Sequence, residues 1–165
     1  MIDKSLLISL VSALAAVVSA LYAHRTTKLS EKRLKTEYVF SLYKEIIQWL
    51  NNHKEARDWV YEPKVNEGKL KDNWDNWHFD DFLGYFEALW ALKKKNAVDI
   101  ELIYDLVSDY LVSMFEETNE LKECIQQLRE SYEKEKGAPS FYYEGVENLY
   151  KHLKEFEKQH KLKEL

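Results

Sequence analysis

The chain has 165 residues with 24 basic and 29 acidic side chains, a formal net charge of −5, and one cysteine. Residues 1–35 hold six of the basic and two of the acidic side chains, which leaves 18 basic and 27 acidic side chains, a formal charge of −9, for residues 36–165. Such an acidic body disfavours nucleic-acid binding, because phosphate binding depends on Lys and Arg. The single cysteine, Cys124, excludes an internal disulfide and a multi-cysteine zinc site, so we expect a reduced cytosolic domain.

The first predicted element is a membrane-spanning helix. Residues 5–23 carry no charged side chain, and a helix of this length rises roughly 28 Å, close to the roughly 30 Å of a bilayer's hydrocarbon core. A signal peptide has basic residues before a shorter apolar run, whereas here they follow it. Because basic residues stay on the cytoplasmic side, the amino terminus is expected outside and the carboxyl terminus inside. We therefore predict a single-pass protein of the bacterial inner (cytoplasmic) membrane, with residues 1–24 as the transmembrane helix.

Small residues recur at alternating spacings of four and three along this predicted span. They are Ser5, Ser9, Ser12, Ala16, Ser19 and Ala23. Small side chains let membrane helices approach closely, and serine can donate hydrogen bonds across the interface. The stripe therefore predicts a homo-oligomer in the lipid bilayer, and its spacing fits both a helix–helix contact and the wall of a water-filled lumen.

A basic cluster follows the predicted span: Arg25, Lys28, Lys32, Arg33 and Lys35. Such a cluster determines topology, and it also suits anionic lipid headgroups, so we describe it as a lipid headgroup collar. No proline or glycine occurs between Ser5 and Glu62, and apolar residues continue at helical spacing. The sequence predicts that the first helix continues as a stalk over residues 25–62 and weakens near Asn51 and Asn52.

Residues 63–165 are predicted to form a cytosolic antiparallel helical bundle. Proline and glycine are scarce, and no alternating strand pattern is present. Residues 63–77 are the only long predicted loop. Helices are expected over residues 80–95, from Asp99 to the break at Gly137, and from about Ser140 onward. The fold class is therefore all-α, with an amino-terminal transmembrane helix, a stalk and a bundle.

The sequence offers little support for catalysis. No two histidines are spaced three or four residues apart, so no helical metal site is expected, and no cofactor-binding motif is present. The side-chain acceptors of His78, Asp80 and Asp81 are interpreted as a cap at the start of the next helix, where they interact with the helix dipole. Trp74, Trp77, His78 and Phe79 form an aromatic cluster that is either a binding anchor or a lid over the bundle core.

One polar stretch in the last predicted helix bears a resemblance to a known motif. Glu144, Asn148 and His152 are spaced by four residues, so they share one face of the helix. This face is either a solvated surface or the remnant of a site. The stretch from Glu147 to His152 is similar to the motif of helical HEPN nucleases, in which an arginine precedes a polar residue and a later histidine. Asn148 and His152 match that motif, but Glu147 stands in place of the arginine, which implies a HEPN-like bundle without catalytic activity.

The chain as a whole resembles two families. Its span, collar and the segment YFEALWALKKKNAVDIELIYDLVSDY, residues 85–110, look like an uncharacterised bacterial family of single-span proteins. Its architecture and the Asn148/His152 pair are also similar to the small membrane-anchored accessory proteins of type VI-B CRISPR loci. That second resemblance implies a ring-shaped membrane pore that strengthens antiphage defence by depolarising the membrane, functionally linked to an RNA-guided effector.

Three functions follow as hypotheses. The leading one is a non-enzymatic oligomeric pore or permeability effector in bacterial defence, with no direct binding to nucleic acid. The second is a membrane-tethered interaction or sensor module, in which the bundle binds a protein and the span only localises it. The third is a HEPN-type ribonuclease that uses Asn148 and His152.

Overall fold

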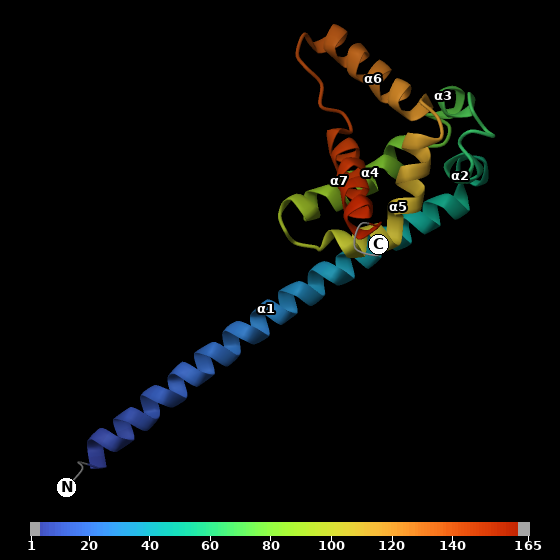
Figure 1. Ribbon diagram of the computed structural model, residues 1–165. Coiled ribbons are helices and arrows are strands. Elements are labelled where there is room, and N and C mark those ends of the chain that lie inside the picture. The colour runs from blue at the N-terminus through green and yellow to red at the C-terminus, as the bar shows by residue number, and fades with distance from the viewer. Residues whose placement is uncertain (1–3, 162–165) are drawn as a thin grey trace. The chain divides into compact units, whose positions relative to one another are not determined.

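The computed structural model describes the backbone of residues 4–161 and the side chains of residues 19–160. Every regular element within the described residues is an α-helix, which confirms the all-helical prediction (Figure 1). The helices are, in chain order, α1 (Lys4–Asn52), α2 (Lys54–Tyr61), α3 (Lys69–Asn73), α4 (Phe79–Lys94), α5 (Ile100–Glu116), α6 (Glu120–Lys136) and α7 (Glu144–Lys161). The chain divides into two compact units, residues 1–37 and residues 38–165, and α1 contributes to both.

The first unit is the amino-terminal part of α1. From residue 19 to residue 34 the described side chains are exposed, large apolar ones among them: Leu21, Tyr22, Leu29 and Leu34. The hydroxyls of Thr26 and Thr27 donate to backbone carbonyls one turn earlier, at 2.9 and 3.0 Å. Among the residues that the structure describes, no helix has the length and apolar character needed to cross a membrane. The predicted span falls mostly on residues 5–18, whose side chains lie outside the described part of the chain.

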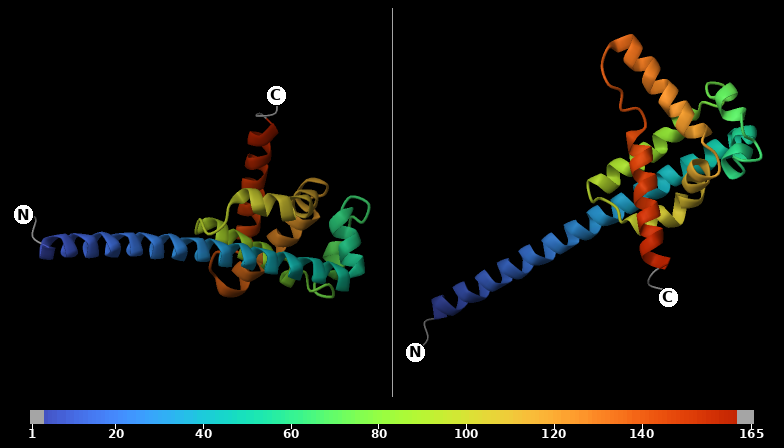
Figure 2. Two further views of the ribbon diagram at one scale, coloured as in Figure 1. Left: turned by 90° about the horizontal axis from the view of Figure 1, so that it is seen from below. Right: turned by 45° about the horizontal axis from the view of Figure 1, so that its top comes forward.

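The second unit has one hydrophobic core to which α1 contributes its carboxyl-terminal turns. Val39, Leu42, Ile46 and Leu50 are buried, and their spacing of three and four residues places them on one face of the helix. The remaining helices follow the same rule. The fully buried side chains of α4, α5, α6 and α7 include Phe82, Phe86, Ile103, Leu111, Leu121, Ile125, Val146, Leu149 and Leu153. Helix α7 packs against both α4 and α5, and it crosses α4 in Figure 1 and in the right panel of Figure 2.

Aromatic side chains fill the centre of this core. The ring of Trp49 stacks on Phe82 with a centroid distance of 4.4 Å, and Phe79 meets the rings of Trp49 and Trp59 edge-on. Trp74 and Trp77 are buried beside them. Of the predicted aromatic cluster, the two tryptophans and Phe79 are therefore part of the core rather than an exposed binding anchor.

The prediction of one helix from Asp99 to Gly137 is wrong, because the chain turns between α5 and α6. Residues 117–119 separate the two helices, and the Thr118 hydroxyl accepts a hydrogen bond from the Glu120 backbone N–H at 3.3 Å. The Glu120 carboxylate is buried and binds groups on α2 and around α3. These long-range contacts fix the start of α6. The spacing of apolar residues continues through the turn, so that spacing alone predicts one unbroken helix.

Two helix limits also differ from expectation. Helix α3 occupies part of the segment predicted as a loop over residues 63–77. Helix α7 begins at Glu144 rather than near Ser140, because Tyr143 has a positive φ of 57° that is incompatible with a right-handed helix. Gly137, with a φ of 67°, ends α6 in the left-handed conformation that glycine adopts without a steric penalty. The linker of residues 138–143 therefore joins two fixed helix ends.

Candidate functional site

The structure pairs Glu147, in the stretch from Glu147 to His152, with an arginine from another helix. Arg129 on α6 donates from Nη1 to Glu147 Oε1 at 3.1 Å. Its Nε and Nη2 atoms both donate to the Tyr142 carbonyl, at 2.9 and 2.6 Å. The guanidinium thus joins α6, the linker and α7. Local spacing could not predict this pair, because Arg129 and Glu147 lie on different helices.

The other residues of that stretch do not converge on a reactive centre. Asn148 is half-buried, and Glu144 and His152 are exposed. The His152 ring packs edge-on against Trp90 of α4, with a centroid distance of 4.9 Å. The arrangement therefore stabilises the contact between α7 and α4.

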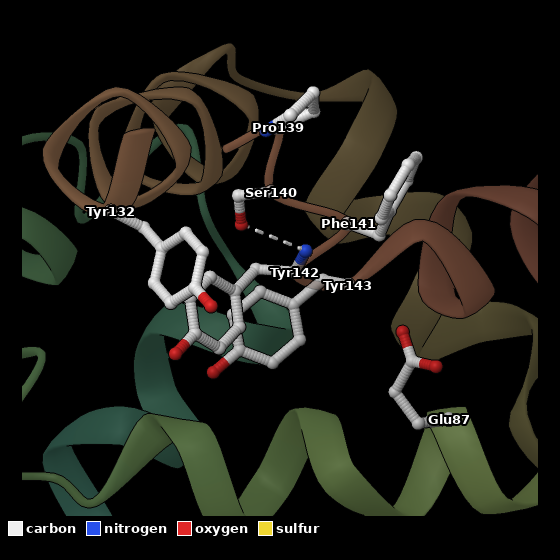
Figure 3. A pocket seen from close by; sticks show the side chains of 7 residues that line it. All are labelled: Glu87, Tyr132, Pro139, Ser140, Phe141, Tyr142 and Tyr143. Atoms are coloured by element: carbon white, nitrogen blue, oxygen red, sulfur yellow. Dashed lines mark hydrogen bonds between the residues drawn. The ribbon is translucent and has the colours of Figure 1, made fainter. Parts of the chain in front are cut away.

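A cavity of about 450 Å³ lies beside the linker between α6 and α7. Its walls come from α4, α6 and the linker, and they are Glu87, Tyr132, Pro139, Ser140, Phe141, Tyr142 and Tyr143. In Figure 3 the rings of Tyr132, Tyr142 and Tyr143 gather together with their hydroxyls on one side, while Phe141 and Pro139 lie apart from them. The Tyr132 and Tyr142 rings meet at 90° with their centroids 5.3 Å apart. We call these three tyrosines the tyrosine wall.

Hydrogen bonds at both ends hold the linker that carries this wall. The Tyr142 backbone N–H donates to the Ser140 hydroxyl at 3.3 Å, and the Tyr142 carbonyl accepts from Arg129. The Tyr143 hydroxyl donates a hydrogen bond to Asp80 Oδ1, which also accepts from the Trp74 indole at 2.9 Å. Burial, and then the hydrogen bond to Asp80, raise the pKa of the Tyr143 hydroxyl, so this group stays protonated.

Glu87 on α4 serves both the fold and the cavity. Its Oε1 accepts from the Val146 backbone N–H at 3.0 Å, which satisfies a donor in the first turn of α7. A Cβ at Gly145 would lie 2.1 Å from Glu87 Oε2 and 2.9 Å from Trp90 Cδ1, so the close approach of α7 to α4 requires glycine there. The carboxylate is also the charged group that lines the 450 Å³ cavity.

A second cavity of about 270 Å³ shares the tyrosine wall. The other residues that line it are Asp80, Leu128, Ser131 and Glu135. The two cavities together are thus lined by three carboxylates and by no lysine, arginine or histidine among the described side chains. Lys136 forms an ion pair with Glu135, and Arg129 contacts the Tyr142 carbonyl, so the negative charge of the two linings resides mainly on Glu87 and Asp80.

Glu120 is a buried carboxylate with a structural role. Its Oε2 accepts from the Trp59 indole at 2.9 Å and from the Gly68 backbone N–H at 3.1 Å, and its Oε1 accepts from the Lys71 backbone N–H at 3.0 Å. These three donors come from α2 and from the start of α3. The carboxylate therefore connects α6 to both helices, and it satisfies the Trp59 indole, which would otherwise be a buried donor without a partner.

The one cysteine lies beside this carboxylate and is shielded from reagents. Burial, and then the charge of Glu120, raise the pKa of the Cys124 thiol to about 11, and its side chain is only 6 % exposed. At pH 8 roughly one thiol in a thousand is then ionised, and only the thiolate attacks alkylating reagents. We expect native protein to react with iodoacetamide at least about a hundredfold more slowly than protein unfolded in urea, measured by mass spectrometry. Equal rates in the two states would contradict the buried position of this side chain.

The remaining predicted site residues divide between described and undescribed parts of the chain. Ser19 and Ala23 are exposed on α1, whereas the side chains of Ser5, Ser9, Ser12 and Ala16 lie outside the described residues. In the collar, four residues are exposed and Lys35 is half-buried, and Arg33 forms a 3.0 Å ion pair with Glu37. Within the described part of the chain, no group of three or more histidine, cysteine or acidic side chains is placed to hold a metal ion.

Sequence reasoning missed the tyrosine wall. Its only signal is the short segment FYYEG, residues 141–145, after the break at Gly137, because Tyr132 joins it from the preceding helix.

Comparisons of the chain with protein-family models, curated proteins and solved structures give no match.

Proposed function

We propose that the protein is an oligomeric membrane protein that makes the bacterial inner membrane permeable. The observation that carries this proposal is the uncharged run of residues 5–23, with its stripe of small residues and the basic collar directly after it. The helical backbone that begins at Lys4 supports this proposal, because in lipid every backbone N–H and C=O group must find its hydrogen-bond partner within the protein. The resemblance to accessory proteins of type VI-B CRISPR loci supports a role in RNA-guided antiphage defence.

A non-enzymatic role is part of this proposal. The guanidinium of Arg129 is occupied by Glu147 and by the Tyr142 carbonyl, so it is poorly placed to bind a scissile phosphate. The formal charge of −9 over residues 36–165 also disfavours RNA.

Bulky substitutions in the small-residue stripe test the proposal. The double variant Ser12→Leu/Ala16→Leu should still insert, because each leucine favours the membrane by roughly 0.5 kcal/mol. The added bulk should abolish close helix packing or block a lumen. We expect normal membrane localisation, with loss of the oligomer in mass measurements in detergent or loss of ion flux in liposomes.

A matched variant controls for added bulk as such. Val17→Phe/Leu21→Phe places larger side chains on the side of the helix away from the stripe, and it should assemble and conduct like the parent. If the stripe variant also assembles and conducts like the parent, the permeability proposal fails. A parent protein that is monomeric in detergent and silent in liposomes would also refute it.

A membrane-tethered binding module is the second candidate. The cavity of about 450 Å³ beside the tyrosine wall favours it, because a pore needs no preformed cavity in its cytosolic part. In that case the stripe variant Ser12→Leu/Ala16→Leu would keep function in cells, whereas substitutions in the tyrosine wall would abolish it.

A further inference from the structure

We infer that the tyrosine wall is a binding site for a small quaternary ammonium compound. This inference concerns residues 80–143 of the second unit and is independent of the proposed membrane function. Its basis is the combination of a cavity, aromatic faces and negative charge in one place.

The first argument concerns the rings. Tyr132, Tyr142 and Tyr143 line both cavities, and Figure 3 shows them grouped with their hydroxyls on one side. The Tyr142 and Tyr143 rings are inclined by 35° with their centroids 6.0 Å apart, while Tyr132 stands perpendicular to Tyr142. Such an arrangement presents ring faces and edges in different directions. Ring faces attract cations through the negative charge above and below their planes.

The second argument concerns charge. The larger cavity is lined by Glu87, and the smaller one by Asp80 and Glu135. Neither Arg129 nor Lys136 lines a cavity: the Arg129 guanidinium is directed to Glu147 and to the Tyr142 carbonyl, and Lys136 forms an ion pair with Glu135. Asp80 and Glu87 are therefore the carboxylates on which this argument rests. The wall therefore repels anions and favours a cationic ligand.

The third argument selects the kind of cation. A primary ammonium group is strongly hydrated and needs several acceptors to replace its water. In the larger cavity Glu87 is the one carboxylate, and one of its oxygens already accepts from Val146. A trimethylammonium group has no donors to satisfy and loses little hydration, so aromatic rings with one nearby carboxylate suit it better. A volume of about 450 Å³ also accommodates a compound of the size of choline.

The site is assembled before any ligand arrives. The linker is held by Arg129, the Tyr143 hydroxyl is fixed on Asp80, and the start of α7 is fixed on Glu87. A preformed wall reduces the conformational entropy lost on binding.

The experiment measures choline binding to the full-length protein in an uncharged maltoside detergent. Calorimetry gives the affinity, and saturation-transfer NMR reports whether the ligand's methyl groups contact aromatic protons. We expect saturable choline binding. The neutral isostere, in which a tert-butyl group replaces the trimethylammonium group, should bind at least about tenfold more weakly, as should ethanolamine, which has the primary ammonium group. Equal binding of either compound, or no saturable choline binding, would overturn the inference.

Two variants, each with a matched control variant, locate the site. Glu87→Gln removes the charge but keeps an oxygen for the Val146 N–H, and it should weaken choline binding roughly tenfold. Tyr142→Leu should weaken it about three- to tenfold, whereas Tyr142→Phe keeps the aromatic face and should bind nearly as well as the parent. Glu155→Gln makes the same charge change at an exposed position of α7 and should have no effect. If Glu87→Gln binds like Glu155→Gln, or Tyr142→Leu like Tyr142→Phe, the site is not at the tyrosine wall.

Discussion

Replacing Glu120 with alanine is expected to lower the free energy of unfolding of the helical bundle by about 2–4 kcal/mol. The side chain is 7 % exposed, and its two oxygens accept hydrogen bonds from Trp59, Gly68 and Lys71. Alanine leaves the buried Trp59 indole without its acceptor, which costs about 1–3 kcal/mol. The Gly68 and Lys71 N–H groups are only partly buried and add a smaller loss, because water can replace part of their hydrogen bonding. Urea denaturation followed by circular dichroism measures the loss.

Two further variants show whether the hydrogen bonds are responsible. Glu120→Gln keeps the shape, but its amide nitrogen must face at least one backbone N–H, so an intermediate loss is expected. Glu123→Ala removes an exposed carboxylate from the same helix turn and should cost less than about 1 kcal/mol. Equal losses for Glu120→Ala and Glu123→Ala would show that the three hydrogen bonds contribute little.

Replacing Phe82 with alanine should destabilise the bundle by a comparable amount, about 3–5 kcal/mol. Its ring is fully buried and stacks on Trp49, and it also contacts Phe79 and Phe86 at centroid distances of 5.4 and 5.2 Å. Truncation removes the apolar surface buried on folding and leaves a cavity that large, rigid neighbours fill poorly. The same denaturation experiment measures the effect.

An exposed phenylalanine provides the matched control for this substitution. Phe141 is 72 % exposed on the linker, so Phe141→Ala should change the stability by less than about 0.5 kcal/mol. A small loss for Phe82→Ala would mean that the core around Trp49 rearranges to fill the space.

Helical periodicity predicted the core better than the connections. The spacing of apolar residues identified the buried face of α4 at Phe82, Phe86 and Leu89, and that of α7 at Val146, Leu149 and Leu153. Local pattern suffices here because a helix buries one continuous stripe. The turn between α5 and α6 escaped prediction because its cause is distant: Trp59 lies 61 residues from the carboxylate that it binds.

The tyrosine wall was beyond local reasoning for a similar reason. Tyr132 lies on α6 and Tyr142 in the linker, and the chain turns between them at Gly137 and again after them at Tyr143, both with positive φ values. A tyrosine is a poor candidate for a left-handed conformation, so nothing in the sequence suggests that the chain turns there. The hydrogen bond to Asp80, 63 residues away, accompanies this strained backbone.

The position of the tryptophans determines what an optical experiment on this protein reports. All five lie between Trp49 and Trp90, within the second unit, and all but Trp90 are buried. Tryptophan fluorescence therefore follows only residues 38–165, whereas the circular dichroism signal also includes the helical residues 4–37 of α1. Transitions recorded by the two signals need not coincide. A difference between them would reflect separate melting of two units rather than a folding intermediate within the bundle.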